Sequence, residues 1–188
     1  MANPLDQSIS KGAGLAPEVR ARMDGLVGVF EALVEQHGEA GALLERAKGN
    51  SAKRAELWPT IRASLRAHEK GELAEVYPIF REYAELVPLA DRHEKEASEL
   101  SATLDAMDAM DPAGGPFGAR LDKLIGLVEA HVVEEEHAIF PRAQAVMGKA
   151  RAKELEPKFA ATAKKIKQAD LEPTRHEARR SEPLSRTR

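Results

Sequence analysis

The sequence contains no cysteine, and aromatic residues make up only 4% of its 188 positions. Without cysteine the chain has neither disulfides nor thiolate metal ligands, so a bound metal must be held by histidine and carboxylate side chains. The hydrophobic residues are mostly alanine and leucine, a composition that favours helices over strands. The expected fold class is therefore all-α.

Long apolar runs are also absent. No stretch approaches the roughly 20 apolar residues that a membrane-spanning helix needs. Residues 1–15 lack the apolar core of a signal peptide. We therefore expect a cytoplasmic protein with no membrane partner.

The charge is uneven along the chain, with the basic excess at the C-terminal end. From Lys149 onward the chain carries 12 basic and 6 acidic residues, although the whole chain has a net charge of −3. This segment lacks the interleaved aromatic residues on which nucleic-acid bases stack. It is interpreted as a solvated basic helix and tail, and no nucleic-acid partner is expected.

Four stretches place apolar residues at helical spacing and are joined by short turn signals. The clearest loop is Asp111-Pro112-Ala113-Gly114-Gly115-Pro116, and Pro59 and Pro78 predict a late start or kink and a frayed end for the second helix. The pattern predicts an up-down-up-down four-helix bundle over residues 16–148. A disordered lead (1–15), a short basic helix (149–169) and a disordered tail (170–188) complete the predicted domain organisation.

One motif occurs twice, on the second and fourth predicted helices. His68 and His131 are each followed by glutamate four residues later, Glu72 and Glu135, and by proline ten residues later. Residues i and i+4 lie on the same helical face, so each His–Glu pair can approach one metal centre together. Imidazole nitrogen suits a transition metal, and a carboxylate can bridge two of them.

The other two helices each carry one histidine on the predicted inward face, His37 and His93. A lone histidine on an apolar face is more often a satisfied core residue than a ligand. Four together reverse that expectation, because burying so many polar groups without a metal costs several kcal/mol each. We therefore predict two metals, each with two histidines and joined by Glu72 and Glu135.

Other polar residues are expected to be bystanders. His137 is placed off the inward face, His176 in the tail, and Glu69, Glu134 and Glu136 on the solvated surface. A ferritin-type site needs two Glu-x-x-His repeats and the chain has one, Glu134 to His137. The His-Glu-x-x-His motif of zinc proteases is absent.

These residues resemble the hemerythrin-like family, also called the HHE cation-binding domain. The resemblance covers about Leu15 to Met147, with its predicted ligands His37, His68, Glu72, His93, His131 and Glu135. It implies a four-helix bundle around two non-haem iron ions, joined as an oxo- or hydroxo-bridged di-iron centre. It also implies a small diatomic ligand or peroxide as partner, because members bind oxygen, sense oxygen or iron, or react with peroxide or nitric oxide.

The chain departs from the oxygen-carrying members of that family at one position. They add a second histidine one turn after the third-helix histidine, where this chain has Ala97. The missing ligand leaves an open position, which favours reaction with peroxide or nitric oxide over oxygen storage. We expect a monomeric di-iron protein that binds or reacts with O2, peroxide or NO. The alternatives are an iron- or oxygen-responsive binding module without turnover, and a metal-free helical interaction bundle.

Overall fold

The computed structural model describes residues 25–172 of the chain. The predicted lead, His176 and nearly all of the predicted tail lie outside the described residues. Every regular element between residues 25 and 172 is helical, which confirms the all-α prediction. The elements are α3 (Val29–Ala47), α4 (Ser51–Glu75), α5 (Tyr77–Phe80), α6 (Val87–Asp108), α7 (Gly115–Glu134), the π-helix η1 (Glu135–Ile139), α8 (Phe140–Met147) and α9 (Lys149–Leu171). None of these helices is long and apolar enough to cross a membrane.

The ends of α4 follow local rules of helix capping. The Asn50 side chain accepts a hydrogen bond from the backbone N–H of Lys53 at 3.0 Å, which satisfies one of the free donors of the first turn. The helix continues through Pro59, so the predicted late start is wrong. It ends at Glu75, and Pro78 then occupies the first turn of α5, where its missing N–H costs no hydrogen bond.

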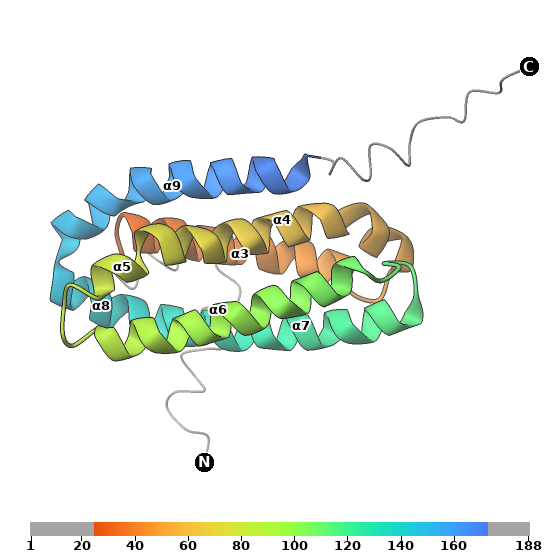
Figure 1. Cartoon of the computed structure of the whole chain (residues 1–188), viewed down its shortest axis with the longest axis horizontal. Helices are drawn as coiled ribbons and strands as arrows, with labels where there is room; N and C mark the ends of the chain where they lie inside the picture. The colour runs from red at the N-terminus through yellow and green to blue at the C-terminus, as the bar shows by residue number, and fades with distance from the viewer. Residues whose placement is uncertain (1–24, 173–188) are drawn as a thin grey trace, which may run out of the picture.

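The helix α9 lies alongside α4 over much of its length, and α3 packs against both (Figure 1). Near the end of α9, the Asp170 carboxylate pairs with Arg62 at 2.8 Å and with Arg66 at 2.9 Å, both on α4. α4 contacts α3, α6 and α9. Because it is covered from three sides, the buried part of its surface is wider than the single apolar stripe of an amphipathic helix.

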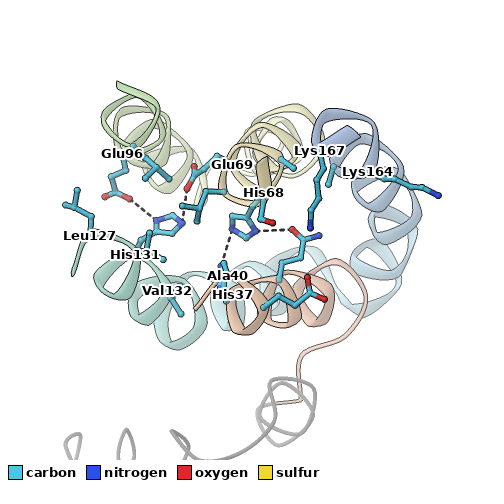
Figure 2. A pocket seen from close by; sticks show the side chains of 18 of the residues that line it. His37, Ala40, His68, Glu69, Glu96, Leu127, His131, Val132, Lys164 and Lys167 are labelled. Atoms are coloured by element: carbon cyan, nitrogen blue, oxygen red, sulfur yellow. Dashed lines mark hydrogen bonds and ion pairs between the residues drawn. The ribbon is translucent and has the colours of Figure 1, made fainter. Parts of the chain in front are cut away.

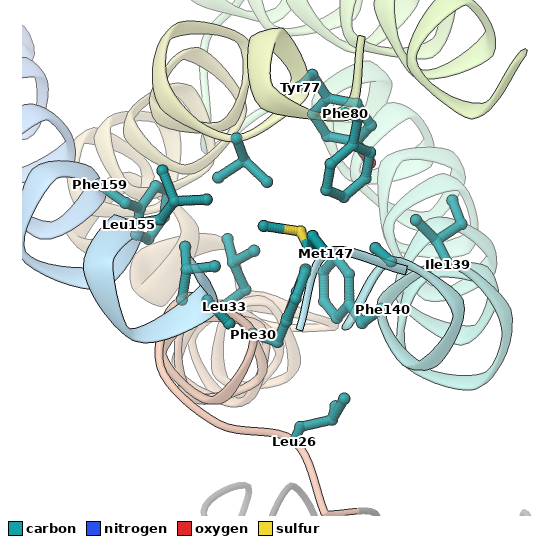
Figure 3. Packing of buried hydrophobic residues seen from close by; sticks show 14 of the residues in the cluster. Leu26, Phe30, Leu33, Tyr77, Phe80, Ile139, Phe140, Met147, Leu155 and Phe159 are labelled. Atoms are coloured by element: carbon teal, nitrogen blue, oxygen red, sulfur yellow. The ribbon is translucent and has the colours of Figure 1, made fainter. Parts of the chain in front are cut away.

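The apolar core consists of two separate clusters. One, shown in Figure 3, packs Phe30, Phe80 and Phe140 at the end of the molecule near α5 and α8. The other contains Trp58 and Phe117 near the α3–α4 and α6–α7 turns. On each of the four helices that carry a predicted ligand histidine, or directly after it, the packing changes from one cluster to the other near that histidine. The flanking residues are Val34 and Ala40 for His37, Leu65 and Val76 for His68, Ala90 and Leu100 for His93, and Val128 and Ile139 for His131. The polar residues therefore meet in the middle of the bundle.

Gly71 of α4 faces Phe159 and Ala163 of α9. A Cβ atom added there would lie 2.8 Å from Cε2 of Phe159, whose ring is fully buried and cannot swing into solvent. Gly71→Ala should therefore lower the free energy of unfolding by about 1–3 kcal/mol, even though alanine is the better helix former. Denaturant titration measures this change.

Gly126→Ala is the matched control. Gly126 is exposed on α7, and an added Cβ meets nothing within 4 Å. This variant should gain about 0.5–1 kcal/mol of stability from helix propensity alone. If both variants gain stability equally, the close approach of α4 and α9 is contradicted.

Candidate metal centre

The six predicted ligands come together between the two apolar clusters. Glu72 and Glu135 are fully buried, His37, His68 and His93 are buried, and His131 is partly buried. Two overlapping groups of side chains in the described part of the chain have ligand atoms within 4.8 Å of one another. The first group is His37, His68, His131 and Glu135, and the second is Glu69, Glu72, His93 and His131.

In the first group, ring nitrogens from two helices face each other. His37 Nε2 lies 3.1 Å from His68 Nε2 and 3.2 Å from Glu135 Oε2. The other ring nitrogens are held from outside: His37 Nδ1 donates to Glu136 Oε1 at 3.0 Å, and His68 Nδ1 donates to Gln36 Oε1 at 3.2 Å. These outer hydrogen bonds fix the tautomer and leave both Nε2 lone pairs directed at the same point, as at metal sites.

The second group includes Glu69, which the sequence interpretation had placed on the solvated surface. That interpretation is wrong, because Glu69 is only 7% exposed. Its Oε2 lies 3.5 Å from His93 Nε2, and its Oε1 lies 3.4 Å from His131 Nε2. Ala97 is buried one turn along from His93. Glu69 thus supplies a carboxylate beside His93, on the helix facing α6.

The π-helix η1 explains a second difference from the sequence interpretation. Glu135 and Glu136 are consecutive, yet both are buried, whereas an α-helix turns neighbouring residues about 100° apart. The wider π turn brings both carboxylates inward, Glu135 to the cluster and Glu136 to the outer nitrogen of His37. Glu136 was expected on the surface and is not there, while His137 is exposed as predicted.

Tyr77, from α5, supports the cluster from the side of the aromatic core. Its hydroxyl donates a hydrogen bond to Glu135 Oε1 at 2.8 Å, and its ring stacks on His93 with centroids 3.7 Å apart. The helix is interrupted between α4 and α5, and Tyr77 is the first residue after this interruption. The ring and hydroxyl of Tyr77 therefore hold the orientations of two predicted ligands.

Several buried atoms at the centre of this cluster have no hydrogen-bond partner among the described residues. They are both carboxylate oxygens of Glu72, one oxygen each of Glu69 and Glu135, both ring nitrogens of His93, and Nε2 of His131. Leaving such groups unpaired costs a few kcal/mol each. Nitrogen and carboxylate donors of this kind are ligands for iron or zinc, so the residues fit a metal centre.

The pKa values of the buried carboxyl and imidazole groups show that the cluster holds positive charge or protons when no metal is bound. Burial, with the charges of Glu135 and Glu69, raises the pKa of Glu72 well above its ordinary value, and burial raises the pKa of Glu69 to about 7. Burial lowers the pKa of His93 to about 4. Burial also lowers the pKa of His131, but the carboxylates of Glu135, Glu69 and Glu96 together outweigh this effect and raise it to about 9. A cation held by Glu69, Glu72 and His131 would take the place of the protons that these groups otherwise bind.

The fold and the cluster define an all-helical domain with a buried, cation-binding His/Glu centre. The profile of the hemerythrin HHE cation binding domain matches residues 28–143, which is more than half of the chain. The chain therefore belongs to the hemerythrin HHE cation-binding family, and the predicted family is confirmed. Comparison with curated proteins and with solved structures returned no match. The helix α9 lies beyond the matched residues.

Proposed function

We propose that the chain is a non-haem di-iron protein, built on an up-down-up-down bundle, that binds or reacts with O2, peroxide or NO. The observation that carries this proposal is the position of the two buried carboxylates. Glu72 Oε2 lies 3.3 Å from His68 Nε2 and 3.6 Å from His93 Nε2. Glu135 Oε2 lies 3.2 Å from both His37 Nε2 and His131 Nε2. Each carboxylate thus stands between two histidines from different helices, the place of a bridging ligand between two metals.

The ligands divide into two sets under this proposal. His37 and His68 hold one iron, and His93 and His131 hold the other. Glu72 and Glu135 are shared between the sets, and Glu69 adds an oxygen donor beside His93. The iron pair, when bound, supplies ferrous–ferric redox chemistry and coordination positions for a small ligand.

The protein's own residues set the conditions around that pair. The two apolar clusters cover the centre at its two ends along the bundle. The Tyr77 hydroxyl donates a hydrogen bond to Glu135 Oε1, with the two oxygens 2.8 Å apart, and so balances part of the carboxylate charge. Glu69 adds a carboxylate beside His93 and His131, so the centre has one oxygen donor more than the sequence predicted.

Metal analysis and optical spectroscopy test the proposal. Protein loaded anaerobically with ferrous iron should hold about two irons per chain, because the ligand atoms form two groups. On oxidation it should gain the near-ultraviolet absorption of a coupled ferric pair, and peroxide or NO should change the spectrum of the ferrous form. Zinc-loaded protein is the control, since zinc takes the same ligands without redox change. One iron per chain, or none, would contradict the dinuclear centre.

A further inference from the structure

A cavity of about 610 Å3 runs past the histidine cluster and reaches α9 (Figure 2). Its walls come from α3, α4, α6, α7 and α9. His37, His68, Glu69 and His131 form part of the wall, so the cavity adjoins the candidate metal centre. The α9 portion of the wall lies beyond the residues that the family profile matches, which end at 143.

The cavity is far larger than O2, NO or peroxide requires. Cavities of about 300–1,000 Å3 are the size that holds organic ligands. Much of the wall is apolar, with Leu65, Leu100 and Val128 from three different helices. An apolar wall of this extent favours a ligand with a hydrocarbon body.

The lysines that line the cavity in the described part of the chain, Lys164 and Lys167, are both on α9. In Figure 2 the Lys167 side chain turns toward His68, whereas Lys164 extends away from the cavity. No ion pair of Lys167 occurs among the described residues, so its ammonium group is available to a ligand. Gln36 also lines this part, and because its Oε1 accepts from His68 Nδ1, its amide N–H groups are left to donate. The opposite end, between α6 and α7, is lined by Glu96, Glu99 and Glu134, and Glu39 of α3 is a further acidic residue of the wall.

We propose that this cavity binds an amphipathic organic carboxylate with a medium-length hydrocarbon body. The carboxylate is held by Lys167 and the Gln36 amide, and the hydrocarbon body extends along Leu65 toward His68 and His131. The carboxylate itself stays away from the metal ligands, since the acidic end of the cavity repels it. Any effect of the metals on such a ligand rests on the proposed function. Binding of the ligand requires only the cavity.

Calorimetric titration of the full chain with octanoate tests the proposal. Lys167→Gln should weaken octanoate binding about tenfold or more, because a charge-assisted hydrogen bond is lost. The same variant should bind octanol as the original chain does, within about twofold, since the hydrocarbon wall is unchanged. Lys165→Gln is the matched control: Lys165 is exposed on α9 and does not line the cavity, so binding should not change.

A second variant fills the cavity without touching the core. Ala160 is exposed on α9 and lines the cavity, so Ala160→Trp should fold normally and weaken both octanoate and octanol. The optical spectrum of the iron-loaded protein should stay unchanged on octanoate binding. If the spectrum shifts and Lys167→Gln binds octanoate normally, the carboxylate is a metal ligand and the proposal is overturned. Absence of octanoate binding also overturns it, whereas absence of iron with normal octanoate binding contradicts only the di-iron proposal.

Discussion

Glu135→Ala should empty the metal centre. The Glu135 carboxylate is fully buried and lies 3.2 Å from the Nε2 atoms of both His37 and His131, so its loss removes a donor from both proposed metals. Loss of an outer hydrogen-bond partner alone weakens metal binding about 10–100-fold, and loss of a shared ligand should exceed about 100-fold. Elemental analysis after loading and gel filtration measures the remaining iron.

His137→Ala is the matched control for this experiment. It lies two residues further along the same π-helix, is exposed, and its Nδ1 donates only to the backbone oxygen of Val133. Its replacement should leave iron content unchanged. Glu69→Ala should reduce iron content as well, because Glu69 lies beside His93 and His131. If His137→Ala empties the centre and Glu135→Ala does not, the helical register of η1 is wrong.

Removal of metal should destabilise the fold strongly. A ligand that binds only the folded state stabilises it by about 2.7 kcal/mol at 100 times its dissociation constant. The metal-free chain additionally buries unpaired oxygens of Glu72 and unpaired nitrogens of His93. For a chain of this size, a loss of 1 kcal/mol in the free energy of unfolding lowers the unfolding midpoint by about 2–4 °C. Chelation should therefore lower the midpoint by about 5–10 °C or more.

Thermal unfolding with and without chelator, followed by circular dichroism, measures this shift. The Glu135→Ala variant supplies the control, because a protein that has already lost its metal should not respond to chelator. Equal midpoints for the original chain under both conditions would mean that no metal is held by the folded state. A chelator response in the Glu135→Ala variant would place the metal elsewhere.

The part of the centre that could be predicted from the sequence depends on regular helix geometry. His68 with Glu72, and His131 with Glu135, are one turn apart on a helical face wherever the helix forms, so their pairing needs no knowledge of neighbouring helices. His37 and His93 were predicted because each stands in an apolar stripe. The structure places all six residues in one buried cluster, and their role as ligands stays a prediction.

Glu69 and Glu136 could not be found in this way, for two different reasons. The sequence interpretation gave each helix one buried stripe, which leaves Glu69, next to His68, outside. In the structure α4 is covered by α3, α6 and α9, so a wider part of its surface is buried. Glu136 is buried because η1 is a π-helix, and no periodic pattern in the sequence marks the change in turn.

Composition and helical periodicity by themselves predicted the fold class and the pairing of histidine with glutamate, because these follow from short-range geometry along one helix. The family was recognised by the resemblance of the repeated motif and was shown by the family profile. Only the tertiary structure decided that Glu69 joins the cluster, that Tyr77 and Glu136 hold its ligands in place, and that α9 helps to enclose a cavity beside it. Each of these depends on which neighbour covers which side of a helix, and that is set by packing between segments distant in the sequence.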